Sequence, residues 1–512
     1  MATTAGMLFY CLLVFLIPPR LAAGQEPPQP IAATAAAAVA GAAAPTAAKP
    51  ADEDPVVTWW REHVKGSIRS KTFASFRTTL EEQTSVRQEG VLRLEINQDL
   101  GEGFGLFLVP QWKADSRNYV KEPWMNFRDS TFRDPYFSFN QGYLKYRTES
   151  FDLAVGKQIY SWGTADGYNP TDYLLNPWDY QDIPDREKIG MFSVSANYYL
   201  TNTTSFQLIV VPLFTPSRIP MVNNRWLGVG IPIRSFLDPL GLGGFAKSVL
   251  PAVDFIIKDG RKLPPKRFEN TEVAFRAKTS AISGWDLSLS YFDGFDNLPV
   301  VSLNGPICIP PVPGITNGLC VGPPKTVFPR VRAPGFDFST TFGKLEVHGE
   351  AVAKFYDGGK TTDRMPVVFG GRYTWDQSDV EGLGLEQILL VLEYANDIDL
   401  HKRDDPLTRD LSFFVRPIQS TIISRIALKI DDANEFTFST AINFYGPNSG
   451  YLQPKYAYKF TDNLKAEVGF DIFWGDFKVK PELSAPFFSK KLSFWGKWER
   501  NDRGFLNMTY LF

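Results

Sequence analysis

Alternation of apolar and polar side chains is the feature that most constrains this chain. From about residue 65 to the carboxyl terminus, short segments show this period-2 pattern again and again. In "LKAEVGFDIFW", residues 464–474, the apolar side chains share one face of a strand, and Lys465, Glu467 and Asp471 share the other. A single segment of this kind would also suit a soluble sandwich, so the argument rests on the repetition.

Segment length and the spacing of the connections indicate a membrane barrel. Each segment is close to the ~9–11 residues that a tilted strand needs to cross a bilayer. Short connections such as "DLGEG", "TESF" and "TDN" interleave with long ones at 114–136, 162–189, 215–266, 296–330 and 396–419, as periplasmic turns and outer loops do. Because lipid satisfies no backbone groups, such strands must close on themselves. We therefore predict an all-β fold, a transmembrane antiparallel outer-membrane β-barrel.

The number of strands follows from the segments and from a parity argument. We count about nineteen alternating segments, with 488–499 among them, but bacterial single-chain barrels use even strand numbers. Either "FKVKPEL", residues 477–483, is an additional strand, or one of the segments is not a strand. We predict about 18 strands, with a range of 16–20.

The carboxyl terminus ends on "GFLNMTYLF", residues 504–512. Its alternate residues up to Tyr510 and Phe512 would form an apolar strand face against lipid. This ending resembles the terminal assembly signal of outer-membrane barrels, which implies the barrel-assembly machinery and outer-membrane lipid as partners.

The amino-terminal residues differ from the rest of the chain. Residues 7–18, "MLFYCLLVFLIP", are too few to span a bilayer and are typical of a secretory signal peptide, which we place at 1–24. Residues 25–57 are rich in Ala and Pro and predict a periplasmic tether, with the barrel over 58–512. We therefore expect export to the outer membrane of a Gram-negative bacterium.

Two cysteines lie close together in the exported part of the chain. Cys308 and Cys320 flank the Pro/Gly-rich "CIPPVPGITNGLC", and in an oxidising compartment this spacing favours a disulfide. The alternative is a pair of unpaired thiols.

One stretch carries a resemblance to a known family. "VGKQIYSWGTADGYNPTDYLLNPWDYQDIPDREKIG", residues 155–190, contains Gly-Lys-Gln, Trp-Gly, two Asn-Pro-x-Asp motifs and a charged cluster. In these motifs, and in "VVPLFTPSRIP" at 210–220, the chain resembles a family of Gram-negative porin-like outer-membrane β-barrels catalogued mainly as a domain of unknown function. A more distant likeness, through the Gly-Lys-Gln and Trp-Gly element, is to alginate-export-type porins. The resemblance implies an outer-membrane channel.

The same loop supplies candidates for a constriction, in which opposed charges select solutes at a narrow point. The alternative is that its Asn-Pro and Asp residues only form and cap turns. The constriction-loop candidates are Trp162, Asp166, Asn169, Asp172, Asn176, Asp179, Asp185 and Arg186.

Strand alternation also predicts which charged side chains face the lumen, where basic residues outnumber acidic ones and favour anions. Alternatively, these side chains simply pair across neighbouring strands. The pore-lining candidates are Arg93, Lys145, Arg147, Arg276, Lys278, Lys344, Glu346, His348, Glu350, Arg425, Lys429, Lys465, Glu467 and Asp471.

The sequence gives little support for catalysis or a cofactor. It has only three His residues, and no motif places a nucleophile beside His348. We therefore expect no enzyme, no cofactor and no resident metal, and the balanced charge of 54 basic and 56 acidic residues gives no reason to expect nucleic acid.

The sequence favours a porin-like channel for passive passage of small or medium solutes. The alternative is a structural barrel that sheaths or docks a periplasmic partner, such as a cytochrome or an exporter component. Whether the apolar stretch 225–262 plugs the pore is left open.

Overall fold

The computed structural model describes residues 54–117, 119–124, 130–228, 261–303, 324–359, 361–401, 418–475 and 494–512, with isolated positions between 244 and 258 and two short strands at 307–308 and 320–321. The predicted signal peptide, most of the tether, "FKVKPEL" and nearly all of 229–260 lie outside the described residues. Among the described residues, no helix is long and apolar enough to cross a membrane.

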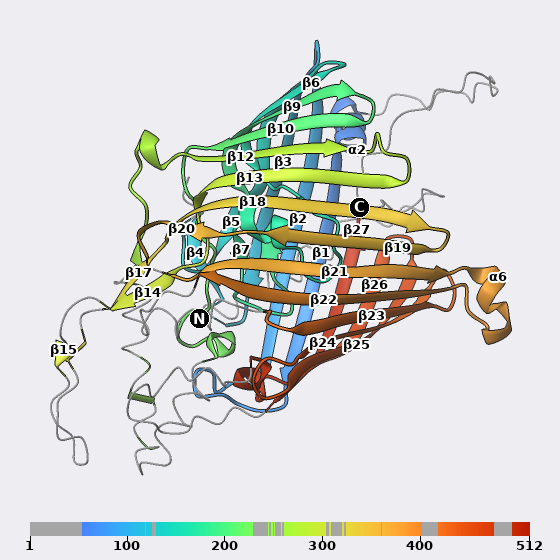
Figure 1. The fold of residues 1–512 in the computed structure, drawn as a ribbon. Coiled ribbons are helices and arrows are strands. Elements are labelled where there is room, and N and C mark those ends of the chain that lie inside the picture. The colour runs from blue at the N-terminus through green and yellow to red at the C-terminus, as the bar shows by residue number, and fades with distance from the viewer. Residues whose placement is uncertain are drawn as a thin grey trace.

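The fold is a closed antiparallel β-barrel (Figure 1). Its sheet has 20 strands, of which β4 and β20 are short additions, so 18 strands of the described chain form the ring. These are β1 (Val64–Ser75), β2 (Val86–Gly101), β3 (Phe104–Asp115), β5 (Asp134–Arg147), β6 (Phe151–Gln158), β9 (Met191–Thr201), β10 (Thr204–Val211), β12 (Glu272–Thr279), β13 (Trp285–Phe295), β18 (Arg330–Phe342), β19 (Leu345–Val352), β21 (Asp363–Trp375), β22 (Gln387–His401), β23 (Thr421–Lys429), β24 (Asn434–Asn443), β25 (Ser449–Thr461), β26 (Leu464–Gly475) and β27 (Arg503–Leu511). Each strand pairs with the next, and β1 also pairs with β27, which closes the ring.

Smaller elements occupy the connections. The helices are α2 (Pro55–His63), α3 (Pro170–Leu175), α6 (Gln377–Val380), η1 (Arg225–Leu227), η4 (Phe268–Asn270), η5 (Asp357–Gly359), η6 (Glu381–Leu383) and η8 (Trp495–Trp498). The short strands are β4 (Val120–Trp124), β7 (Trp178–Asp179), β8 (Glu187–Lys188), β11 (Arg261–Lys262), β14 (Val300–Leu303), β15 (Ile307–Cys308), β16 (Cys320–Val321), β17 (Pro324–Val327) and β20 (Phe355–Tyr356).

The predicted barrel and its strand number are confirmed, and the structure shows why the count by sequence was one too high. Residues 495–498 of the segment 488–499 form η8 instead of a strand. Three tryptophan and phenylalanine side chains, Phe494, Trp495 and Trp498, pack with Trp226 and Phe473 into an aromatic cluster. Packing into this cluster overrides the alternation that suggested a strand.

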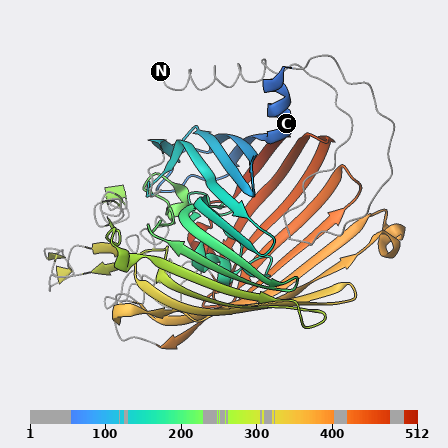
Figure 2. The ribbon, with the colours of Figure 1, turned by 90° about the horizontal axis from the view of Figure 1, so that it is seen from above.

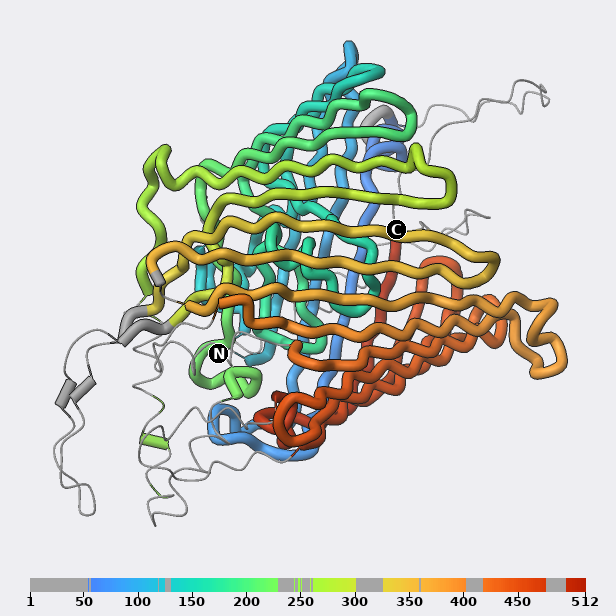
Figure 3. Tube along the Cα trace, viewed as in Figure 1, coloured from blue at the N-terminus to red at the C-terminus, as the bar shows by residue number. Residues whose placement is uncertain are grey.

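The two ends of the barrel differ. The short connections, α2 and the carboxyl terminus lie at one end of the barrel. The strands β14, β15 and β17 lie at the opposite end, as Figure 1 and the trace in Figure 3 show. β15 and β16 pair with Cys308 directly opposite Cys320. This register places the backbones of the two cysteines side by side. The disulfide between them stays a prediction.

The outer face of the wall is apolar. Side chains that point away from the lumen include Leu144, Leu289, Phe369, Leu392 and Phe470, and all are exposed. The same holds for Leu506, Met508, Tyr510 and Phe512 of the last strand. The apolar face predicted for "GFLNMTYLF" therefore lies on the outside of the barrel, as a lipid-facing surface requires.

Candidate functional site

Residues 159–190, between β6 and β9, do not leave the barrel but fold into it, and we call them the inserted segment. The views in Figures 1 and 2 agree in placing the chain around β7 within the ring of strands. Local sequence explains the turn that begins α3: the side chain of Asn169 accepts a hydrogen bond from the backbone N–H of Asp172, and Pro170 occupies the first turn.

The first half of the inserted segment packs on an apolar patch of the inner wall. Tyr160, Trp162, Leu174 and Leu175 are buried against residues of β9, β10, β12, β13, β18 and β19. Two of the wall residues in this cluster, Ala274 and Ala333, are small and leave room for the segment. A hydrophobic core therefore lies inside the barrel and holds the segment to one wall.

Two wall carboxylates bind the backbone of the same half. Glu350 of β19 accepts hydrogen bonds from the N–H groups of Thr164 (2.6 Å) and Ala165 (2.7 Å). Glu393 of β22 accepts from the N–H groups of Asp166 (2.6 Å) and Gly167 (3.0 Å). Both carboxylates are almost completely buried, and each accepts from at least two backbone N–H groups, so the segment is held to this wall at two adjacent points.

The second half reaches the opposite wall through ion pairs. Asp182 accepts from Arg87 of β2 (2.6 Å) and from Arg503 of β27 (2.7 Å), and Asp185 pairs with Lys71 of β1. Although burial opposes ionisation, Arg503 and Arg87 hold the pKa of Asp182 below its usual value.

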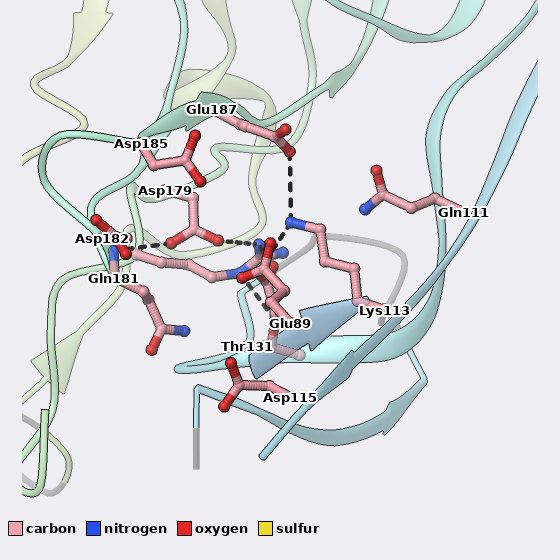
Figure 4. A network of polar contacts seen from close by, with 12 residues as sticks. Glu89, Gln111, Lys113, Asp115, Thr131, Asp179, Gln181, Asp182, Asp185 and Glu187 are labelled. Atoms are coloured by element: carbon pink, nitrogen blue, oxygen red, sulfur yellow. Dashed lines mark hydrogen bonds and ion pairs between the residues drawn. The ribbon is translucent and has the colours of Figure 1, made fainter. Parts of the chain in front are cut away.

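Glu187 is the most highly paired acid of the inserted segment. It lies 2.7 Å from Arg69, 3.1 Å from Arg93 and 3.4 Å from Lys113. Figure 4 shows Lys113 reaching from the wall to Glu187, with Asp179, Asp182 and Asp185 of the same segment close by. Burial works against the charge, yet these three cations hold the pKa of Glu187 well below its ordinary value.

Asp179 behaves differently because another carboxylate lies beside it. Asp134 and Asp179 share the guanidinium of Arg218, at 2.6 and 3.1 Å. Burial and the neighbouring Asp134 raise the pKa of Asp179 to about 8. Asp179 therefore differs from Asp182 and Glu187, whose pKa values are lowered.

The inserted segment thus joins opposite walls of the barrel, and the predicted constriction-loop residues divide into three groups by their exposure. Trp162, Asp172, Asn176 and Asp179 are buried, whereas Asp166 is exposed in the lumen. Asn169, Asp185 and Arg186 are partly buried. The segment that contains them crosses the lumen, and their role in selectivity stays a prediction.

Several of these candidates also build the local fold, as the alternative interpretation expected. Asn176 exchanges hydrogen bonds with the backbone of Tyr160, and its N–H₂ group also donates to Asp172 (3.0 Å). Asp172 pairs with Lys188 at 2.7 Å, and Trp162 donates to Gln207 of β10 at 2.7 Å. Arg186 donates to the hydroxyl of Tyr173.

The ladders place the pore-lining candidates on the inner face of their strands, except Lys344, which lies in the turn between β18 and β19. Arg93, Arg276, His348, Glu350, Arg425 and Asp471 lie at the level of the inserted segment or its anchors. Lys145, Arg147, Lys278, Lys344, Glu346, Lys429, Lys465 and Glu467 lie nearer the short-turn end. Many are paired within the wall, for example Lys465 with Glu467 at 3.2 Å and Glu346 with Arg372.

The anchors themselves were not singled out by the sequence. Arg69, Lys71, Arg87, Arg503 and Glu393 bind the inserted segment. Alternation alone would have placed all five on inner faces, since each shares its face with residues already assigned to the lumen. The pairing of each anchor with a particular group of the inserted segment depends on the path of that segment. No local sequence pattern reveals this path.

A closed antiparallel barrel with an apolar outer face, a charged lumen and a chain segment folded into that lumen belongs to the porin-like class of outer-membrane barrels. Within that class, the chain belongs to the family described as "Protein of unknown function (DUF1302)", which matches residues 119–400. The matched region contains the inserted segment and the wall from β5 almost to the end of β22. The family resemblance of residues 155–190 is thereby confirmed.

Solved barrels resemble the protein at low identity. OccAB3 of Acinetobacter baumannii is 9% identical, with a TM-score of 0.44 and coverage of 88% of this chain and 98% of that one. Wzi of Escherichia coli, described as a carbohydrate-binding β-barrel involved in group 1 capsule assembly, is 10% identical, with a TM-score of 0.44 and coverage of 89% and 85%. OccK9 (OpdG) of Pseudomonas aeruginosa is 8% identical, with a TM-score of 0.44 and coverage of 88% and 97%. No curated protein sequence matches the chain.

Proposed function

We propose that the protein is a channel for passive passage of small or medium solutes across the outer membrane, narrowed by the inserted segment. The observation that carries this proposal is the course of residues 159–190, which bind inward-facing groups on opposite walls. A segment fixed in this way reduces the cross-section of a wide barrel at a defined level. Passage then depends on the groups that remain exposed beside it.

The charges beside the segment support a preference for anions. Arg425 of β23 and Asp166 of the inserted segment face each other at 3.6 Å, and the Arg425 side chain is 40% exposed. Lys145 and Lys278 line the wall toward the short-turn end, and the Lys465 side chain there is 49% exposed. Such an arrangement gives a transverse field at the narrow level and a cationic wall leading to it.

The alternative of a barrel that sheaths a threaded periplasmic partner is less favoured. At the level of the inserted segment, the chain itself fills lumen space with the apolar core around Trp162 and Leu174. A partner docked at the short-turn end, outside the lumen, remains compatible with the geometry. The proposed function requires no catalytic residue.

The test is single-channel conductance of the refolded protein in a planar bilayer with a salt gradient. We expect discrete open steps with a reversal potential on the anion-selective side. Arg425→Gln should shift the reversal potential toward cations, because it removes an exposed positive charge at the narrow level. Arg267→Gln is the matched control, since the Arg267 side chain is 70% exposed and precedes β12 in the long connection after β10.

Two outcomes would contradict the proposal. A folded barrel that shows no conductance would exclude an open channel. Equal shifts in the Arg425 and Arg267 variants would show that the lumen charge at the inserted segment does not govern selectivity.

A further inference from the structure

A His and two carboxylates meet where the inserted segment contacts the wall. His348 of β19 and Glu393 of β22 come from the wall, and Asp166 comes from the inserted segment. One ligand atom from each lies within 4.8 Å of the other two. The sequence does not reveal this cluster, because its three residues are far apart in the chain and lie on separate elements.

The two wall residues already have the separation of metal ligands. Nε2 of His348 lies 3.0 Å from Oε1 of Glu393, and both side chains are fully buried. Two donors that each bind Zn²⁺ at ~2.0–2.1 Å in a tetrahedral site lie about 3.3 Å apart. Gly370, which pairs with both residues across the sheet, permits this approach, because a Cβ there would lie 2.7 Å from Cγ of Glu393.

The other ring nitrogen of His348 gives an independent indication. Nδ1 is buried and has no hydrogen-bond partner among the described residues, and it lies 4.0 Å from Oε1 of Glu346. A neutral imidazole that donates from Nε2 to Glu393 would turn the lone pair of Nδ1 toward the Glu346 carboxylate. If Nε2 instead bound a metal, Nδ1 would carry the proton and face that carboxylate, which is the usual outer arrangement of metal-binding His.

Asp166 completes the cluster from the side of the lumen. Its side chain is 23% exposed, whereas those of His348 and Glu393 are fully buried, so water can reach the site from the side of Asp166. Its backbone N–H already donates to Oε1 of Glu393, which holds the residue beside the wall. Arg425, at 3.6 Å from Asp166, is the nearest paired cation. A divalent ion would balance the charges of Asp166 and Glu393.

We propose that Asp166, His348 and Glu393 form a binding site for a divalent transition metal such as Zn²⁺, at the contact between the inserted segment and the wall. An imidazole with two carboxylates is a donor set that Zn²⁺ and its neighbours in the series accept, whereas Ca²⁺ and Mg²⁺ prefer oxygen ligands alone. Water supplies the remaining positions. Metal binding is measured directly, so the test of this site does not depend on whether the barrel conducts.

The experiment is isothermal titration of the refolded, metal-free barrel in detergent with Zn²⁺, checked by metal content after gel filtration. We expect one Zn²⁺ per barrel, and a loss of affinity of about tenfold or more in both His348→Gln and Asp166→Asn. His401→Gln is the control for adventitious His binding, because His401 is an exposed residue at the end of β22. Asp432→Asn, on an exposed turn, is the control for the carboxylate change.

The second ligand variant keeps the proposal falsifiable. If the buried His348→Gln change impairs folding, Asp166→Asn still reports on the site, since the Asp166 side chain is 23% exposed and that of His348 is fully buried. Wild-type and variant proteins that bind Zn²⁺ equally would overturn the proposal, as would the absence of saturable binding. The latter result would instead indicate an imidazolium held between Glu346 and Glu393. Tighter binding of Ca²⁺ than of Zn²⁺ would overturn the assigned class of ion.

Discussion

At the scale of single residues, the structure is unusual for the charges buried around the inserted segment. Asp182 binds two guanidinium groups, and the side chains of Arg503, Asp182 and Arg87 are 2%, 7% and 8% exposed. Desolvation of such groups offsets much of their attraction, so the set adds little net stability by itself. Removing Asp182, however, takes one buried counter-charge from both arginines, and leaves Arg87 with Asp115 and Glu89 and Arg503 with Asp471.

We expect Asp182→Asn to destabilise the barrel strongly. The amide is similar in shape but leaves Arg87 and Arg503 facing no carboxylate from the segment, which costs about 3–5 kcal/mol for a buried pair. Reversible guanidinium unfolding of the refolded protein would measure the change. Asp462→Asn is the matched control, because the Asp462 side chain is 67% exposed and pairs with Lys459 on a turn, where ~0–1 kcal/mol is typical. Similar losses in both variants would argue against a buried anchor.

At the scale of elements, ring closure depends on the meeting of the first and last strands. β1 and β27 pair from Ser67↔Leu511 to Ser75↔Arg503. Beyond that ladder, Gly66 and Phe512 exchange two backbone hydrogen bonds of 2.7 and 3.0 Å. The ring of Phe512 lies over Gly66, where a Cβ would overlap it. The terminal aromatic residue thus packs at a specific position on the first strand, against Gly66.

Gly66→Ala should weaken this closure. The added methyl group displaces the Phe512 ring, and overpacking of this kind costs about 1–3 kcal/mol. The measurement is the thermal midpoint of the folded barrel, followed by its mobility on unheated gels. Gly382→Ala is the control, because a Cβ there meets nothing within 4 Å. An unchanged thermal midpoint in the Gly66 variant would show that packing of Phe512 on Gly66 does not stabilise the closed barrel.

At the scale of the whole molecule, the apolar outer face implies a defined depth in a bilayer. Leu289, in the middle of β13, is 64% exposed, and Ile282, in the short turn before that strand, is 56% exposed. Because the two side chains are similarly exposed, a different cost of a charge at the two positions would distinguish a lipid-facing wall from an ordinary apolar surface. Only a membrane makes a charge costly at one position and tolerable at the other.

We expect Leu289→Lys to cost about 2–4 kcal/mol and Ile282→Lys only ~0–1 kcal/mol. The measurement is the free energy of unfolding in lipid vesicles. The order follows from the depth dependence of burying a charge in hydrocarbon. Equal costs at the two positions would contradict the inferred membrane span.

The sequence by itself determined the wall of the barrel. A period of two leaves each strand only two faces, and only one of them tolerates Lys465, Glu467 and Asp471 when the other meets lipid. Strand positions, the assignment of faces and the short and long connections therefore followed from local pattern. The pattern was wrong at 488–499, where aromatic packing around Trp498 produces a 3₁₀-helix.

Only the tertiary structure decided what lies inside the wall. Asp166, His348 and Glu393 share no local pattern, and neither do Asp182, Arg87 and Arg503, because loop and wall meet across large sequence separations. The acids at 166–187 suit a solvated loop as well as a buried one. Their location follows from a path that is stabilised jointly by the core around Trp162 and by cations on other strands. Alternation is a property of neighbouring residues, whereas the lumen site depends on which distant residues the closed ring brings together.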